Sequence, residues 1–477
     1  MTAELVLPEE VGVVNVGLPL FAEAVRRQGR PAVQVEWRVP ADGDPVALAA
    51  LRRLSGPLTE RVDEANAEVF RRLDTGAPVV SAIRPAGEVV PGLTDQALRH
   101  AGPALDLADV GDPLRRSMRA AVVAEGWAED PEAADALLAS DEVALGPANE
   151  SGGVVPMAAV VGPTTPVWVV TLPDTGLTAW APLGQGSGNV AWFGRDTPEA
   201  VERLVLVRDA VAPVLREALA ATDAPVDVLS LAAQAVAMGD DVHVRTQAAT
   251  NLLLKQLLPG LVGSTHPRRA EAARLLSENH LLFLTLAMAA ARTLTAWAGQ
   301  VEGSSVVTTM ARNGTTFGVR LSGSTQWFRS PAPMIGRALY HPGRGPDDGA
   351  PDIGDSAVLE LVGLGGAAAA GSPAVGQLVG GTAAAAELTR ELERVCVGRS
   401  GRITLAMADG RGTPLGVDVR RVVEHGITPK VTTGILHNSD GSGQIGAGVA
   451  EAPLGCFRAA LLDLDARLGG RPDRGAG

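Results

Sequence analysis

The stretch Ser304–Gly323, SSVVTTMARNGTTFGVRLSG, combines a turn sequence with a side chain that can bind anions. β-Branched runs flank Asn313-Gly314, and this pattern predicts a β-hairpin with positive φ at both turn residues. Arg312 precedes the turn, and a guanidinium can pair with a carboxylate or phosphate through two parallel hydrogen bonds. The local sequence leaves two interpretations open: a solvated arginine beside a turn, or an anion-binding arginine with Asn313 and Gly314 as further donors.

A second polar group, Met238–Arg245, interrupts a helical pattern. Asp240 and His243 stand three residues apart, which places them on the same face if the helix continues. An imidazole there is a candidate general acid or base. Gly239-Asp240 equally fits the end of one helix and the N-cap of the next, so a capped helix junction is an open alternative.

The segment Pro351–Ser356 offers two carboxylates and a hydroxyl around a turn, from Asp352, Asp355 and Ser356. Capping of a helix that begins near Ala357 would account for them. Alternatively, they orient a cation or a catalytic water.

A strand that ends in Thr432-Thr433-Gly434 leads to His437 and then to a glycine-rich stretch containing Gly446. Glycines let backbone N–H groups approach a ligand closely. His437 is a candidate general acid or base, with a purely structural histidine as the alternative.

Composition excludes several classes of function. A net charge of −13 argues against nucleic-acid binding, which needs a basic face, and 3% aromatic residues provide few base-stacking side chains. The two cysteines and seven histidines show no metal-ligand spacing, so we expect no metal site and two buried thiols. We also expect no membrane span and, without a recognisable secretory signal, a cytoplasmic protein.

The chain of 477 residues is too long for one ordinary core, and its patterns predict a multi-domain α/β protein. We expect a Rossmann-like α/β domain over 1–105, with strands at 11–16, 31–37 and 77–83 and helices at 18–28 and 59–73. A mixed α/β segment at 106–195, a small all-helical domain at 196–300 and an α/β domain with glycine-rich turns at 301–477 complete the prediction. Within the second of these, Gly184–Asn189 is either a plain turn or a phosphate-binding loop.

Taken together and in this order, several short segments resemble the AllG (YlbE) family over residues 11–460. The matching segments are Val14–Leu18, Val35–Pro40, Pro85–Glu88, Met238–Asp240, Met310–Thr315, Pro351–Ser356, Val379–Thr382 and Gln444–Gly448. The match is specific as a set, because no single segment would suffice.

The resemblance implies a subunit of oxamate carbamoyltransferase, which splits oxalurate with phosphate into oxamate and carbamoyl phosphate in allantoin breakdown. It also implies FdrA-type and AllH-type partner subunits, a small anionic ureido substrate and phosphate. We expect no cofactor. Combined with the polar segments, it gives His243, Arg312 and His437 as candidate catalytic residues. The candidate substrate-binding residues are Gly87, Glu88, Asp240, Asn313, Gly314, Asp352, Asp355, Ser356, Thr433, Gly434 and Gly446.

The chain departs from the family pattern at one place. Pro147–Ser151 stands where the family has Pro-Cys and a run of three histidines before the segment that here ends in Pro156-Met157-Ala158. This leaves open a paralogue acting on another amide or acyl substrate, or a non-catalytic scaffold or regulatory subunit of an FdrA-type complex. The N-terminal β-α-β alone suggests a nucleotide-dependent ligase or dehydrogenase, a weaker alternative because the full glycine fingerprint is missing.

Overall fold

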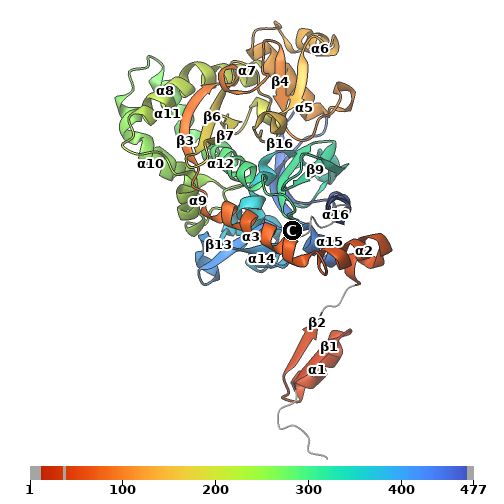
Figure 1. Ribbon diagram of the computed structural model, residues 1–477. Helices are drawn as coiled ribbons and strands as arrows, with labels where there is room; N and C mark the ends of the chain where they lie inside the picture. Colours follow the sequence, from red (N-terminus) through yellow and green to blue (C-terminus); the bar gives the residue numbers. More distant parts are fainter. Residues whose placement is uncertain (1–11, 36–38, 470–477) are drawn as a thin grey trace, which may run out of the picture.

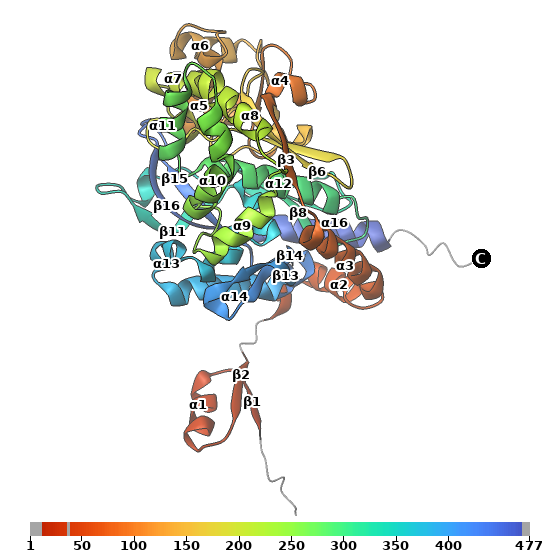
Figure 2. The ribbon, with the colours of Figure 1, turned by 90° about the vertical axis from the view of Figure 1, so that its left-hand side faces the viewer.

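The computed structural model describes residues 12–35 and 39–469. Its first unit is a parallel β-α-β motif of β1 (Val13–Val16), α1 (Pro19–Arg27) and β2 (Ala32–Val35). Figures 1 and 2 show this unit apart from the remaining elements in both views. The β-α-β motif predicted from sequence is therefore confirmed, although the outer ends of both predicted strands lie outside the described residues.

The following elements do not extend this parallel motif. The predicted third strand forms as β3 (Val79–Pro85), but it pairs antiparallel with β6 (Pro166–Leu172) in the sheet β3-β6-β7. The prediction of a Rossmann-like arrangement that includes this strand is wrong, because β3 hydrogen-bonds to a strand from much later in the chain. The division into four domains remains a prediction.

Between the first motif and β7, the chain alternates helices with short strands. A second parallel pair joins β4 to β5, with α5 and α6 between these two strands in the chain. The elements are η1 (Pro40–Gly43), α2 (Pro45–Leu54), α3 (Thr59–Thr75), α4 (Ala86–Val89), β4 (Ala97–His100), η2 (Leu107–Asp109), α5 (Asp112–Ala124), α6 (Pro131–Ala139), β5 (Ala144–Pro147), η3 (Ala148–Ser151) and β7 (Leu177–Pro182).

Residues 198–298 are helical, as the apolar periodicity predicts. The short η4 (Ala191–Phe193) precedes them. Their helices are α7 (Pro198–Leu206), the π-helical η5 (Val207–Val211), α8 (Ala212–Ala220), α9 (Val228–Ala237), α10 (Gln247–Gly263), α11 (Arg269–Glu278) and α12 (Leu282–Ala298). In the described part of the chain, no single helix has the length and hydropathy of a membrane span; α11 and α12 meet that test only as a pair bent by 79°.

The C-terminal part contains three sheets, with strand orders β10-β9-β8-β12, β11-β16-β15 and β13-β14. Its strands are β8 (Val307–Asn313), β9 (Thr316–Leu321), β10 (Phe328–Pro331), β11 (Ile335–Tyr340), β12 (Ile353–Gly354), β13 (Cys396–Leu405), β14 (Arg411–Val417), β15 (Lys430–Leu436) and β16 (Gln444–Glu451). Its helices are η6 (Pro346–Asp348), η7 (Ser356–Val358), η8 (Glu360–Val362), η9 (Gly365–Gly371), α13 (Pro373–Val379), α14 (Thr382–Val395), η10 (Ala406–Ala408), α15 (Val419–His425) and α16 (Leu454–Gly469). The chain is a mixed, multi-domain α/β protein, in agreement with the predicted fold class.

Helix α12 joins the helical and the strand-rich parts. It is apolar on nearly every side, which is typical of a helix that is buried all round. Its neighbours include the strands β6 and β7 and the helices α3, α9 and η7. In Figure 1 it lies near the middle of the larger body, where it can hold side chains from distant segments against one another.

Candidate functional site

Arg312 lies at the centre of a fully buried ion pair. Its Nε and Nη2 donate to the two carboxylate oxygens of Asp352 at 2.7 and 2.9 Å, and neither side chain is exposed. Nη1 donates to Ser356 Oγ at 3.4 Å, and Nη2 also reaches Thr433 Oγ1 at 3.3 Å. The solvated arginine is thus excluded, and the cation that the 351–356 segment orients is this guanidinium.

The hairpin around Arg312 forms, but its turn differs from the prediction. Asn313 is the last residue of β8, and only Gly314 has positive φ, at +85°. The Asn313 side chain is buried, where it donates to Pro103 O and accepts from the N–H groups of Thr315 and Thr316. Asn313 and Gly314 therefore shape the turn, and the polar atoms of the Asn313 side chain are used within the protein.

Asp355 is a buried carboxyl group with two backbone donors. Its oxygens accept from Gly102 N at 2.8 Å and Val155 N at 2.9 Å. Asp355 precedes η7 without a side-chain cap bond, so the capping interpretation is wrong. Burial raises the pKa of Asp355 to about 7, although the two N–H groups and the charge of Arg312 oppose that rise.

We expect this raised pKa to make stability depend on pH. In the unfolded chain the carboxyl titrates near 3.9, so the folded state holds one proton more between roughly pH 4 and 7. Its contribution is complete below the unfolded pKa and is lost as pH rises toward 7. The unfolding free energy of the wild type, relative to that of Asp355→Asn, should fall by about 1 kcal/mol per pH unit between pH 5 and 7. Urea titrations at several pH values measure this; a constant difference would contradict it.

His243 is held in one orientation by a buried acidic residue that sequence analysis did not single out. Its Nδ1 lies 2.9 Å from Glu360 Oε1, and both side chains are buried. Because an ionised carboxylate only accepts, Nδ1 carries the proton and Nε2 is the acceptor in the neutral ring. Glu360 Oε1 is fixed in turn by the N–H groups of Gly366 and Thr432.

The junction that carries His243 is a capped loop between α9 and α10, so Asp240 and His243 do not share a helical face. Asp240 binds Arg245 Nη1 at 2.7 Å and accepts from Ala249 N at 2.9 Å, in the first turn of α10. Burial raises the pKa of Asp240 to about 6. Asp241, also missed from sequence, accepts from the N–H groups of His243 and Arg245 and thereby shapes the loop.

His243 lines a cavity of about 70 Å³, which we call the His243 cavity. A single water needs roughly 10–15 Å³ of such a volume, so the cavity admits a small ligand or several waters. Two further predicted residues, Ser356 and Gly434, lie in its wall. The other lining residues are Pro156, Met157, Trp192, Phe193, Val244, Leu281, Leu284, Gln444 and Ala447.

Two strained backbone positions flank this cavity. Val242, which precedes His243, has φ +58°, and Met157 in the cavity wall has φ +49°. Positive φ is a genuine outlier for a β-branched residue, and such strain gathers at functional sites. Gly434 is also constrained, because an added Cβ would lie 2.9 Å from Met157 Cε and 3.0 Å from Gln444 Nε2. The backbone here is shaped around the cavity at an energetic cost.

The remaining predicted residues near this region have structural roles. Thr433 donates to Asp352 Oδ1 at 3.2 Å and so supports the buried ion pair. Gly446 lies in β16, where a Cβ would come within 2.5 Å of Leu339 O, and it does not line the cavity. His437 is outside the cavity wall; its Nδ1 accepts from Ser439 N and Asp440 N in the turn after β15. The structure therefore does not bring His437 together with His243.

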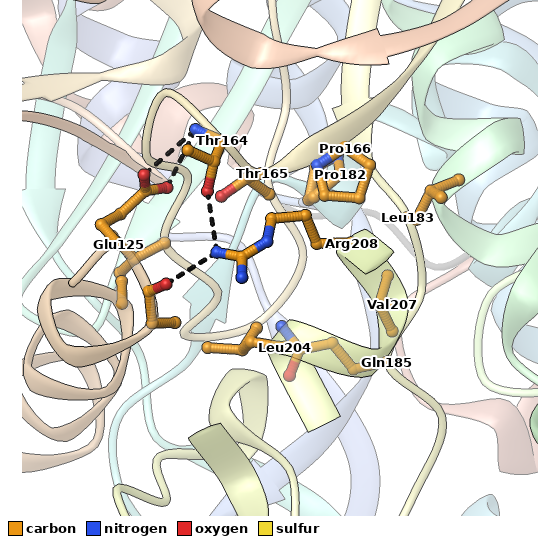
Figure 3. A pocket seen from close by; sticks show the side chains of 13 residues that line it. Glu125, Thr164, Thr165, Pro166, Pro182, Leu183, Gln185, Leu204, Val207 and Arg208 are labelled. Atoms are coloured by element: carbon orange, nitrogen blue, oxygen red, sulfur yellow. Dashed lines mark hydrogen bonds between the residues drawn. The ribbon is translucent and has the colours of Figure 1, made fainter. Parts of the chain in front are cut away.

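Gly87 and Glu88 lie in α4, beside the loop that leads into β6. Gly87 N donates to Pro163 O, and the half-exposed Glu88 pairs with Arg84 at 2.8 Å. Figure 3 shows a second, smaller pocket next to that loop, where Glu125 accepts from Thr164 N and Arg208 donates to Ala124 O. Neither Gly87 nor Glu88 lines it or the His243 cavity.

Within residues 12–35 and 39–469, no group of three or more His, Cys, Asp or Glu side chains is arranged to hold a metal ion. Cys396 and Cys456 are buried and free, and burial raises the pKa of both thiols.

Glu360 carried one sequence signal that could have been used: it is the single charge within the apolar run Ala357–Val362. Asp241 carried none beyond its neighbour Asp240.

Fold and site thus define a multi-domain α/β protein with a small internal cavity, a carboxylate-oriented histidine and a buried arginine ion pair. Residues 143–356 match the family model described as oxamate carbamoyltransferase subunit AllG. The chain is 35% identical over 414 residues to the Escherichia coli K12 protein of that name, covering 86% of this chain and 99% of the relative. The chain belongs to the AllG family.

Two other proteins extend the comparison. The uncharacterized protein YahG of E. coli K12 is 32% identical over 466 residues, covering 97% of this chain and 98% of YahG. A crystal structure of a conserved protein of unknown function from Enterococcus faecalis V583 superimposes with a TM-score of 0.83 at 32% identity, over 86% of this chain and 99% of that one. The larger part of the fold is thus shared with a solved structure.

Proposed function

We propose that the chain is a subunit of an oxamate carbamoyltransferase-like complex and that its His243 cavity takes part in phosphorolysis of oxalurate or a related ureido compound. The observation that carries this proposal is the convergence of His243, Ser356 and Gly434 on one small cavity in a member of the AllG family. Membership supports a role in such an enzyme, and the cavity supplies groups that suit the reaction.

The proposed reaction needs one proton transfer that His243 is placed to perform. A phosphate oxygen attacks the ureido carbonyl carbon, the bond from that carbon to the internal nitrogen breaks, and the nitrogen leaves as the amide of oxamate. With Nδ1–H held by Glu360, Nε2 accepts the proton of the attacking hydrogenphosphate and returns it to the leaving nitrogen. The products are carbamoyl phosphate and oxamate, and no other reactant is consumed.

The developing negative charge requires hydrogen-bond donors in the cavity. Ser356 Oγ lies in the wall and accepts from Arg312, which leaves its own hydroxyl proton free to donate to a ligand. Arg312 itself is not a lining residue, so it acts by positioning Ser356 and the 351–356 segment. This replaces the expectation that Arg312 pairs directly with the substrate carboxylate or phosphate.

The test is formation of carbamoyl phosphate from oxalurate and phosphate by this chain co-expressed with FdrA-type and AllH-type subunits. We expect product from the complex and much less from any subunit alone. If a folded complex makes no product from oxalurate but splits another ureido or amide compound, that other compound is the substrate. A folded complex that acts on none of them would refute the catalytic proposal and favour a scaffold or regulatory subunit, the role suggested by the absence of the histidine run at 149–151.

A further inference from the structure

A second polar cluster lies outside the His243 cavity and includes part of the segment that replaces the histidine run. Asn149 and Glu150 belong to η3, Arg320 to β9 and Arg292 to α12. Arg292 Nη2 donates to Asn149 O at 3.4 Å, and Arg320 Nη2 pairs with Glu150 Oε1. Arg292 stands two turns, roughly 12 Å, along α12 from Leu284 of the His243 cavity. The cluster is therefore a separate place in the fold.

Three donors in this cluster are unsatisfied. Arg292 Nε, Arg320 Nε and Asn149 Nδ2 are all buried and make no hydrogen bond of good geometry with the described residues, although the Asn149 side chain faces the Asp355 carboxyl group. Asn149 is only 4% exposed and Arg320 only 9%. A buried donor without a partner costs about 1–3 kcal/mol, and more when it is charged, so native proteins keep few of them. Three in one cluster indicate that a partner is missing.

A partner that accepts hydrogen bonds and carries negative charge suits these donors. Two guanidinium groups face the cluster, and burial together with repulsion from Arg320 lowers the pKa of Arg292 to about 10, although the carboxyl groups of Asp355 and Glu150 oppose that change. Burial lowers the pKa of Arg320 as well, although Glu150 opposes it. A small oxyanion would accept from all three donors and remove the repulsion between the two cations.

Glu150 is the group that such an anion would displace. Its carboxylate now pairs with Arg320 and accepts from Trp327 Nε1 at 2.9 Å, while its side chain is 50% exposed. A half-exposed carboxylate can turn into water at little cost, since water replaces its partners. Arg320 also stacks over the Trp327 ring at 4.1 Å, which keeps the guanidinium in place when Glu150 leaves.

We propose that Arg292, Arg320 and Asn149 form a binding site for a small oxyanion, a phosphate or a carboxylate, which enters by displacing Glu150. The site goes beyond the proposed reaction, because it lies outside the His243 cavity and its occupancy can be measured without turnover. Its ligand is recognised by charge and acceptor number rather than by shape.

Calorimetric titration of the full chain tests this, with inorganic phosphate in one series and oxamate in the other, at constant ionic strength. We expect saturable binding of at least one anion. Binding of phosphate alone, of oxamate alone or of both would show which class of anion the site accepts. Asn149→Asp should weaken binding at least tenfold by replacing a donor with a negative charge. Glu150→Gln should tighten binding several-fold by removing the competing carboxylate.

The matched control is Arg195→Gln, which changes another arginine with a buried, unpaired Nε, located outside the cluster. It should leave anion affinity unchanged. Thermal unfolding by circular dichroism verifies that each variant is folded. The proposal is overturned if neither anion binds to the folded wild type, or if both cluster variants bind as the wild type does. Should Asn149→Asp not fold, an unaltered affinity in Glu150→Gln overturns it alone.

Discussion

Replacing Arg312 with alanine should lower the free energy of unfolding by about 3–5 kcal/mol, the cost of leaving one partner of a buried ion pair without the other. The change leaves the fully buried Asp352 carboxylate without its cationic partner, which donates two of its hydrogen bonds. It also removes a donor to Ser356 and one to Thr433. Urea denaturation at pH 7.5 measures the loss.

A double variant separates the effect of the two buried charges on stability from the effect of Arg312 on the position of Ser356. Arg312→Met combined with Asp352→Leu removes both charges while keeping similar volume, so most of the lost stability should return. If Arg312 acts by positioning Ser356, the double variant should still lose activity despite its recovered stability. Arg390→Ala is the control, since its pair with Glu387 is more than half exposed on both sides and should cost at most about 1 kcal/mol. A loss below 1 kcal/mol in Arg312→Ala would contradict the prediction.

Replacing His243 with asparagine should reduce kcat at least a hundredfold, with little change in stability. The asparagine amide can take the place of Nδ1 and donate to Glu360 Oε1, so the buried carboxylate keeps a partner. Nothing replaces Nε2, the atom proposed to move the proton. The measurement is carbamoyl phosphate formation by the assembled complex, together with a thermal unfolding curve for the variant.

The control for that variant is His266→Asn. The Nδ1 of His266 accepts from Arg268 N at 3.2 Å, a turn contact that asparagine can reproduce away from the cavity. Its kcat should match the wild type. Activity of His243→Asn within threefold of the wild type would remove His243 from the mechanism, while leaving membership in the AllG family untouched.

The sequence predicts those features whose causes are local. The β-branched runs around residues 307–321 form β8 and β9, and the apolar periodicity after residue 197 forms helices. The predicted two-residue turn at Asn313-Gly314 was wrong, because the last pair of β8 and β9 is Arg312 with Phe317 and the connection is longer. Asn313 keeps negative φ, and its side chain accepts from the following N–H groups. The strand at 79–85 was found, but its partner β6 was not, since pairing between distant strands leaves no local signal.

The candidate site shows the same limit. Arg312, Asp352, Ser356 and Thr433 were each recognisable as polar groups in unusual surroundings, but their mutual contacts join segments up to 121 residues apart. The His243 ring is oriented by Glu360, a residue that belongs to no sequence motif. His437 has the same chemistry as His243 and a similar loop setting, and only the tertiary structure separates them.

The wall of the His243 cavity runs from Pro156 to Ala447 in the sequence. Contacts between the distant segments of this wall close long loops, and loop-closure entropy makes such contacts late events in folding. Refolding chains should therefore regain helical circular dichroism well before they regain any capacity to bind a ligand. A second consequence concerns modularity: the span 143–356 that matches the family model does not include Gly434, Gln444 or Ala447, so that segment by itself would leave one side of the cavity open.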